Sequence, residues 1–441
     1  MVKPLYQKER EVLNFHLSLQ CEKYEKDGID MKFDVVVIGG GFSGVAAAIS
    51  VARQGLKVMI VEKSNCFGGA SVNCLVNPFM QFKSEDKLMS GGIFSEILEE
   101  LKKLKGYDGH LTFDEEKLKL ALNRMIIKEN VFPLFHAVLV DAKTDANKIS
   151  SVTLAFKTQK IEVEAKYFID CTGDGNLAVM AGCDYTIGRK NDGLCQPMTL
   201  CFRVGGVDKN LFWSEFGEIN KRYKQAKAEG KITNPREDVL VFNTLQRGVL
   251  HFNTTRVIKL NPTDVFDVTK AEIEAREQVF EIFYFIKSFA KSFKNAGILS
   301  TASEIGVRES RMITGGHILS EDELLDCTKF EDGIAACNYD IDIHNPEGTG
   351  TSHHYFAPGE YYTIPYRCLC PTKVGNLLVA GRCISSTHEA QASYRIMPTV
   401  CTIGQAAGVG AAVAYKQGCD VADADIKKIR KILSESNAVI D

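Results

Sequence analysis

Residues 34–44 read DVVVIGGGFSG, and three of their glycines, Gly39, Gly41 and Gly44, have the spacing GxGxxG. In a turn between a strand and a helix, the first glycine allows a tight turn and the second lets the backbone approach a pyrophosphate. The third lets the helix pack closely on the strand, and the start of the helix then faces the phosphates. The motif predicts a dinucleotide site if a strand precedes it and a helix follows it.

The flanking residues have this pattern. Val35–Ile38 is a short apolar run, Ser43–Arg53 is an alanine-rich helical segment, and Val58–Val61 is a second apolar run that ends at Glu62. This order predicts a parallel β-α-β unit. A glutamate at the end of the second strand is placed to accept a hydrogen bond from a ribose hydroxyl, so these features together indicate a Rossmann-like nucleotide site.

Further loops indicate which dinucleotide is bound. Glu62 is followed by KSNCFGGASVN, in which Gly68 and Gly69 offer a second place for close backbone contact. An apolar strand ending in FIDCTGD and a distal segment NLLVAGR add two more approaches to the same cleft. A nicotinamide dinucleotide does not need three loops, whereas the ribityl chain and ring of FAD continue past the pyrophosphate. The sequence therefore predicts non-covalently bound FAD, with an NAD-only dehydrogenase as a weaker reading.

Three later segments resemble a known family. They are GVRESRMITGG (306–316), YYTIPYRCL (361–369) and NLLVAGRCISSTHEAQASYRIMPTVCTIGQAAG (376–408). They are similar to FAD-dependent oxidoreductases of the glutathione-reductase structural superfamily, with fumarate-reductase and tricarballylate-dehydrogenase flavoproteins as more distant relatives. The resemblance covers about residues 31–435. It implies that the glycine loops line the FAD, and that the Arg382 loop and the start of the following helix meet the flavin ring.

The residues predicted to contact the cofactor come from these loops. A helix N-terminus beside the ring is physically reasonable, because its positive end stabilises charge on a reduced flavin. The motifs and the resemblance together give the set Gly39, Gly41, Phe42, Ser43, Gly44, Glu62, Lys63, Gly68, Gly69, Ala70, Ser71, Val138, Thr172, Gly173, Asp174, Gly381, Arg382, Arg395, Ile396 and Met397.

Two departures from the relatives restrict the chemistry. Disulfide reductases of the superfamily carry two cysteines five residues apart, just after the paired glycines. This chain has Ser71 and Val76 at those positions, and Cys74 stands alone. The arginine–glycine–glutamate proton-relay segment of fumarate-type flavoproteins is also absent from the sequence. We therefore expect no dithiol half-reaction.

The composition is that of an ordinary globular protein. The chain has 441 residues, of which 45% are hydrophobic and 25% charged, and a net charge of −3, so nothing favours a nucleic-acid or anionic-membrane partner. No apolar run approaches the ~18 residues of a membrane span. The 14 cysteines are scattered without a CxxC pair, which predicts no metal site and a reduced, cytoplasmic location.

The length suits two domains. We expect an α/β fold, in which a discontinuous Rossmann-like FAD-binding domain with a β-meander carries an inserted mixed α/β substrate domain. The predicted divisions are an N-terminal helical extension at 1–30, a first FAD-binding part at 31–187, the insert at 188–364 and a second FAD-binding part at 365–441.

Four further helices are predicted, at 87–104, 113–130, 269–295 and 397–415. Helix 269–295 is rich in phenylalanine and is most simply part of a core. Because its aromatic residues occupy more than one stripe, a homodimer interface is the minority interpretation.

Five residues are candidates for the chemistry. Arg308 and Arg311, in GVRESR, could clamp an anionic group of a substrate or contact phosphates, and a salt bridge is an equally weighted alternative. His353 and His354 lie in a glycine- and aromatic-rich loop and could move a proton beside flavin N5. The alternative is that these two histidines are exposed or have a structural role. His388 follows Arg382 by six residues and could contact the ring or the substrate, or be structural.

These features predict an FAD-dependent oxidoreductase that moves a hydride between a small organic substrate and flavin N5. The alternative is a flavoprotein electron-transfer subunit that works with a partner protein. Because only one GxGxxG follows a strand, reducing equivalents are expected to come from the substrate, a transient nicotinamide or a redox partner.

Overall fold

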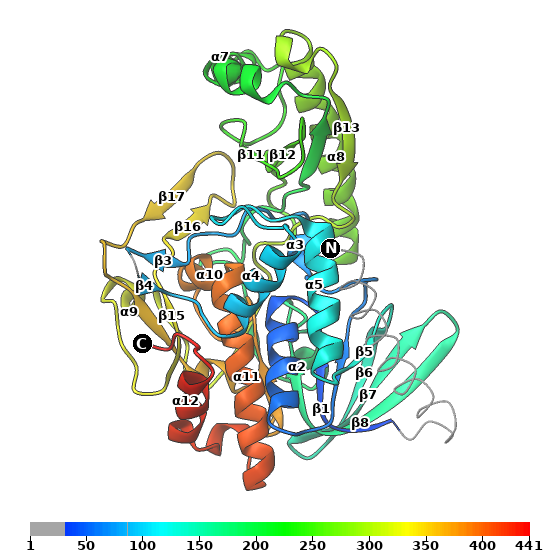
Figure 1. Ribbon diagram of the computed structural model, residues 1–441, viewed down its shortest axis with the longest axis vertical. Coiled ribbons are helices and arrows are strands. Elements are labelled where there is room, and N and C mark those ends of the chain that lie inside the picture. Colours follow the sequence, from blue (N-terminus) through cyan, green and yellow to red (C-terminus); the bar gives the residue numbers. More distant parts are fainter. Residues whose placement is uncertain (1–30, 86) are drawn as a thin grey trace.

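The computed structural model describes residues 31–441 except residue 86, so the predicted N-terminal extension lies outside the described residues (Figure 1). A seven-stranded sheet organises the lower part of the molecule, with the order β5-β2-β1-β8-β7-β6 and with β19 also paired to β8. Its strands are β1 (Lys32–Ile38), β2 (Val58–Val61), β5 (Phe132–Leu134), β6 (Val138–Asp145), β7 (Lys148–Phe156), β8 (Gln159–Asp170) and β19 (Leu377–Val379).

The long strand β8 joins the two halves of this sheet. Strands β5, β2, β1, β8 and β19 run parallel, so their carboxyl ends meet at one edge. The first half of β8, Gln159–Glu164, pairs antiparallel with β7, whereas Phe168–Asp170 pairs with β19. The fold is therefore the predicted α/β type, with a parallel Rossmann-like sheet and a β-meander of β6, β7 and β8.

Helices α2 (Phe42–Arg53) and α11 (Met397–Gln417) lie side by side over the sheet (Figure 1). They approach so closely that a Cβ on Gly404 would lie 2.1 Å from the carbonyl oxygen of Ser43, and one on Gly408 would lie 2.3 Å from that of Ala47. This contact brings the N-termini of both helices to the same edge of the sheet. By length and composition α11 could cross a membrane, but the protein buries the whole of its most apolar 18-residue window, as it does a core helix.

The other helices of this part are α3 (Ala70–Asn73), α4 (Ile93–Lys103), α5 (Glu115–Lys128), α6 (Asn176–Met180), α9 (Glu321–Leu325), α10 (His388–Tyr394) and α12 (Ile426–Glu435). The predicted helix at 87–104 is too long. Lys87–Leu88 forms strand β4 with β3 (Lys83–Ser84), and α4 begins only after Gly92, whose φ of +56° is incompatible with a continuous helix.

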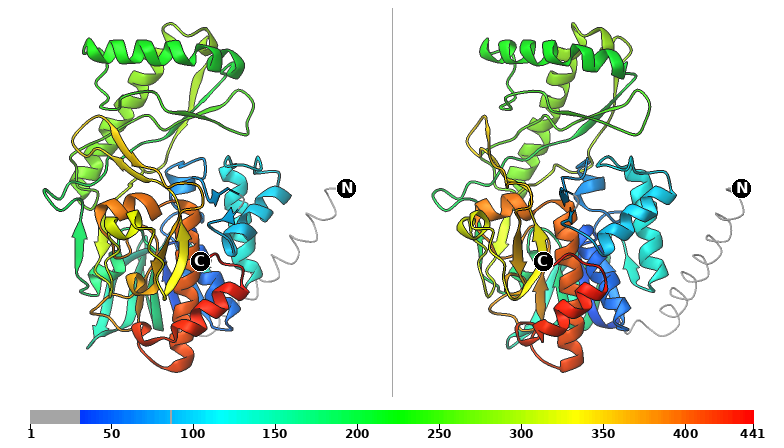
Figure 2. Two further views of the ribbon diagram at one scale, coloured as in Figure 1. Left: turned by 90° about the vertical axis from the view of Figure 1, so that its left-hand side faces the viewer. Right: turned by 60° about the vertical axis from the view of Figure 1, so that its left-hand side comes forward.

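A second core lies above the sheet, in a unit that we call the cap (Figures 1 and 2). Its antiparallel sheet has the order β11-β12-β10-β13. Its elements are β10 (Phe202–Gly205), α7 (Lys209–Ala228), β11 (Val241–Asn243), β12 (Leu250–Phe252), α8 (Val265–Lys287) and β13 (Gly297–Thr301). Helix α8 begins earlier than the predicted 269–295, because Asp264 accepts hydrogen bonds from the backbone of its first turn, and it ends earlier, before a short 3₁₀ helix at Lys291–Phe293.

Three further strand pairs lie outside these two sheets: β9 (Tyr185–Ile187) with β14 (Arg311–Ile313), β15 (Gly333–Cys337) with β18 (Tyr362–Pro365), and β16 (Ile341–His344) with β17 (Thr351–His354). Buried residues of β15 and β18 pack into the main core, whereas the cap core is built from residues 198–307. The separate core is therefore shorter than the predicted insert, 188–364, and the domain boundaries themselves stay a prediction.

Candidate functional site

A cavity of about 450 Å³ lies at the carboxyl ends of the parallel strands. Its walls are the loops after β1, β2, β8 and β19, with segments 68–74 and 137–139, the first turn of α11 and several cap residues. Ligands of open parallel sheets bind at this edge. All the residues predicted to contact the cofactor line the cavity except two. Gly44 packs behind the first loop, and Ile396 is the residue just before the first turn of α11.

The loop between β1 and α2 brings backbone to the cavity wall. Gly39 has a φ of +102°, and a Cβ there would lie 2.3 Å from the carbonyl oxygen of Cys171. A Cβ on Gly44 would lie 1.8 Å from the carbonyl oxygen of Gly39, so helix and strand meet through backbone alone. Helix α2 begins after Gly41, which has no side chain to cap the first N–H groups. These N–H groups and the helix dipole favour an anion at this wall.

Glu62 is buried at the end of β2 and is oriented by backbone. Its two carboxylate oxygens accept hydrogen bonds from the backbone N–H of Gly40, at 2.7 Å, and of Ser64, at 2.8 Å. Each oxygen keeps a further acceptor position, so a ribose hydroxyl can still bind. The neighbouring Lys63 forms an ion pair with Glu304 at 2.8 Å, which ties this loop to the segment after β13.

Asp174 organises the loop after β8. Its Oδ1 accepts from Arg382 Nη2 at 2.6 Å and from the Ser310 hydroxyl at 2.7 Å. Arg311 donates to the Asp174 carbonyl oxygen at 3.2 Å and to Asn176 Oδ1 at 3.1 Å. Burial alone would lower the pKa of Arg382, but the facing carboxylate outweighs it and raises this pKa. Through these contacts Arg311 supports the cavity wall.

The first turn of α11 forms the opposite wall. Helix α11 has no side-chain cap at Ile396, and Met397 and Arg395 line the cavity. The Nε atoms of Arg382 and Arg395 are buried and lack a hydrogen-bond partner among residues 31–441 without 86. Uncapped helix ends and unpaired guanidinium nitrogens around one cavity fit a bound group with several negative or electron-rich atoms, such as the pyrophosphate and flavin of FAD.

None of the five predicted catalytic residues lines the cavity directly. Arg308 and Arg311 do not share a helical face, because Arg308 lies in a loop and Arg311 begins strand β14. Arg308 directly follows Val307, which does line the cavity. Its guanidinium donates to oxygen atoms of Pro197 and Thr199, at 2.7 and 2.6 Å.

The three histidines have different environments. His388 is buried at the start of α10, and its Nδ1 lies 2.7 Å from Glu309 Oε1. This contact agrees with a structural role for His388, which was one of the two roles that the sequence left open. His353 is exposed on β17, with Nδ1 2.6 Å from Asp340 Oδ2 and Nε2 3.7 Å from Asp342 Oδ1. His354 points elsewhere and contacts the ring of Phe356.

The sequence did not indicate several residues of the site. The cap contributes Pro262, Val268, Ile305 and Val307 to the cavity, and no motif marks them. Asp342, whose carboxylate lies 3.6 Å from Arg395 Nη2, is the most important residue that the sequence did not indicate. Burial alone would raise the pKa of Asp342, but His344, Arg395 and His353 outweigh it and hold this pKa well below its usual range.

Cys74 also lines the cavity, and its environment does not favour thiol chemistry. Burial raises the pKa of its thiol to about 12, so the nucleophilic thiolate is scarce at neutral pH. The thiol donates a hydrogen bond to the carbonyl oxygen of Ile305 at 3.6 Å. Ser71 and Val76 occupy the positions of a redox pair, as the sequence indicates.

The chain belongs to the FAD dependent oxidoreductase family, whose model matches residues 34–433. It is accordingly a flavin-dependent redox enzyme, and FAD is its cofactor. This agrees with the donor groups and backbone cradle of the cavity.

Similar proteins match parts of the chain. A thiamine thiazole synthase of Methanococcus vannielii is 30% identical over 202 residues, which are 43% of this chain and 69% of that protein. A thiamine thiazole synthase of Pyrococcus horikoshii is 27% identical over 170 residues, or 35% and 63% of the two chains. Among solved structures, a geranylgeranyl bacteriochlorophyll reductase-like protein of Thermoplasma acidophilum has 14% identity and a TM-score of 0.47, with 92% of this chain and 83% of that chain covered.

Proposed function

We propose that the cavity binds one FAD through the residues predicted from the sequence. The pyrophosphate would lie at the N-terminus of α2 beside Gly41, and the adenosine ribose at Glu62. The flavin would extend toward Arg382 and the start of α11. The observation that carries this arrangement is the convergence of two uncapped helix N-termini on one cavity, which the close crossing of α2 and α11 enforces.

When bound, FAD supplies a hydride acceptor and donor at N5, and we propose that a small organic substrate exchanges a hydride with it. The positive end of α11 would stabilise negative charge that forms on the ring. Apolar cap residues such as Val268, Ile305 and Val307 would exclude water from the reacting groups. No observation on the described residues favours the alternative function, a flavoprotein electron-transfer subunit that works with a partner protein.

We further propose that the chain is related more widely to the glutathione-reductase structural superfamily. The order of its motifs along the chain supports this relation. The partners and the location of the protein stay predictions from composition and motifs. They are a small-molecule substrate, no nucleic-acid or membrane partner, and a cytoplasmic location. A transient nicotinamide or redox partner and a homodimer are further predictions of the same kind.

The first experiment measures the cofactor. The purified protein should be yellow and should release one FAD per chain on denaturation. Replacing Glu62 with Ala should weaken FAD binding about 10- to 100-fold, because a charged acceptor for the ribose is lost. Replacing Glu218 with Gln, which alters an exposed ion pair with Arg222 on α7, serves as the control and should leave affinity nearly unchanged. Folded, colourless protein that refuses added FAD would contradict the proposal.

A proton must leave the site when a substrate is oxidised, and we propose that His353 moves it. Asp342 lies between Arg395 at the cavity and His353 at the surface, at 3.6 Å from Arg395 Nη2 and 3.7 Å from His353 Nε2. The 2.6 Å contact between His353 Nδ1 and Asp340 Oδ2 orients the imidazole. His353→Gln should lower turnover about 100-fold, with normal FAD content. His110→Gln, at another exposed histidine, is the matched control. The assay is anaerobic flavin bleaching with a compound found by metabolite screening, and equal rates for both variants would exclude this role.

A further inference from the structure

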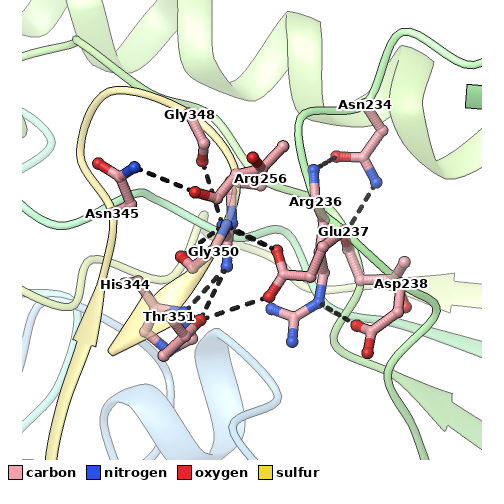
Figure 3. A network of polar contacts seen from close by, with 12 residues as sticks. Asn234, Arg236, Glu237, Asp238, Arg256, His344, Asn345, Gly348, Gly350 and Thr351 are labelled. Carbon is pink, nitrogen blue, oxygen red and sulfur yellow. Dashed lines mark hydrogen bonds and ion pairs between the residues drawn. The ribbon is translucent and has the colours of Figure 1, made fainter. Parts of the chain in front are cut away.

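Four arginines gather between the cap and the β16–β17 hairpin, beside the flavin cavity. We call Arg236, Arg256, Arg308 and Arg395 the arginine cluster. Arg256 holds the hairpin in place, since its guanidinium contacts the carbonyl oxygens of Gly348 and Gly350 and the side chains of His344, Thr351 and Glu237 (Figure 3). Arg236 extends beside Asp238 in the same view. The cluster connects to the cavity through Arg395.

Three of the four guanidinium groups have a carboxylate partner. Arg256 lies 3.0 Å from Glu237, and Arg236 lies 3.5 Å from Asp238. Arg395 lies 3.6 Å from Asp342. These pairs bring the positive charge of three arginines close to balance.

Arg308 has no such partner among residues 31–441 without 86. Its guanidinium contacts only neutral oxygens, those of Pro197, Thr199 and, at 3.5 Å, Asn253. Burial and, to a smaller extent, the nearby Arg395, Arg236 and Arg256 together lower the pKa of Arg308 to about 9, against an opposing effect of Asp342. A cation in this environment is costly unless an anion accompanies it.

The charge count gives the charge that a bound anion would balance. Four guanidinium groups and three carboxylates leave one positive charge. His344 adds none, because burial and the neighbouring arginines hold its pKa well below the usual value. In addition, Nη1 of Arg236, whose side chain is only 7% exposed, has no hydrogen-bond partner among the described residues. The cluster therefore offers one net charge and unused donors beside the cavity.

We propose that the arginine cluster binds the carboxylate of the substrate through Arg308, so that the enzyme acts on a small monocarboxylic acid. This inference rests on the proposed function, because the cavity beside the cluster must hold the flavin. A single carboxylate matches the single unbalanced charge and the planar fork of a guanidinium. A phosphate group near charge −2 would leave an excess of negative charge in a partly buried site.

The test uses propionate as probe, propionamide as its neutral counterpart, and inorganic phosphate. Calorimetric titration of the holoenzyme should show saturable binding of propionate and much weaker binding of the other two. Arg308→Gln should weaken propionate binding about 10- to 100-fold, whereas Arg308→Lys, which keeps the positive charge, should weaken it less. Arg367→Gln, at an exposed arginine paired with Asp332, should keep the affinity.

A second readout does not depend on a variant. Propionate stays ionised above neutral pH, so its affinity for the wild-type protein should fall as the pH rises through about 9 and Arg308 loses its charge. Absence of saturable propionate binding, equal affinity for propionamide, tighter binding of phosphate, or an unchanged Arg308→Gln variant would each overturn the inference. Loss of FAD from a protein that still binds propionate would instead contradict only the proposed function.

Discussion

Gly44→Ala should abolish FAD binding and leave little folded protein. The new Cβ would lie 1.8 Å from the carbonyl oxygen of Gly39 and 2.9 Å from its carbonyl carbon, both of them backbone atoms that no rotamer change can move. Gly39 cannot retreat, because a Cβ placed on it would already lie 2.3 Å from the carbonyl oxygen of Cys171, just after β8. We expect a loss of stability at or beyond the upper end of the ~1–3 kcal/mol usual for overpacking.

The matched control is Gly217→Ala. Gly217 lies on an exposed face within α7, and a Cβ there would meet nothing within 4 Å. Because alanine is the better helix former, this variant should gain about 0.5–1 kcal/mol and keep its FAD. Soluble yield, FAD content and thermal unfolding distinguish the two. Gly44→Ala protein with normal FAD content and thermal unfolding would show that strand and helix can separate at this point, contrary to the geometry.

The nucleotide side of the site was predictable from the sequence because its requirements are local. Gly39, Gly41 and Glu62 lie within one β-α-β unit, and their roles depend on backbone geometry and short spacing. The strand and helix patterns of this unit are strong, so the parallel sheet and its cofactor edge follow from them. The family match supports the same cofactor.

The catalytic side was less predictable, because its contacts join distant parts of the chain. Nothing near Arg395 in the sequence indicates that Asp342, on another element, will be its partner. Arg308 and Arg311 look equivalent in GVRESR, yet only tertiary structure shows that Arg311 contacts the Asp174 carbonyl oxygen and that Arg308 has no carboxylate partner within the described part of the chain. His353 and His354 are equally alike in sequence, but alternation along β17 separates their environments.

Glu309 is the clearest example of such a long-range role. It is fully buried, 79 residues from His388, and joins the segment of Arg308 to the start of α10. Its Oε1 lies 2.7 Å from His388 Nδ1, and its Oε2 accepts a hydrogen bond from the backbone N–H of Gln196. Because α10 ends next to Arg395, this contact helps to hold Arg308 and Arg395 near one another.

Glu309→Ala should therefore cost about 3–5 kcal/mol of unfolding free energy, because it removes one partner of a buried charged contact and leaves donors unpaired. Glu309→Gln keeps the hydrogen-bonding shape and should cost less. Glu347→Ala breaks an exposed pair with Arg189 and should cost no more than about 1 kcal/mol. Urea unfolding of the three FAD-loaded variants measures this order. If Glu309→Ala were no less stable than Glu347→Ala, the buried contact would not be what holds these segments together, and the proximity of Arg308 and Arg395 would need another explanation.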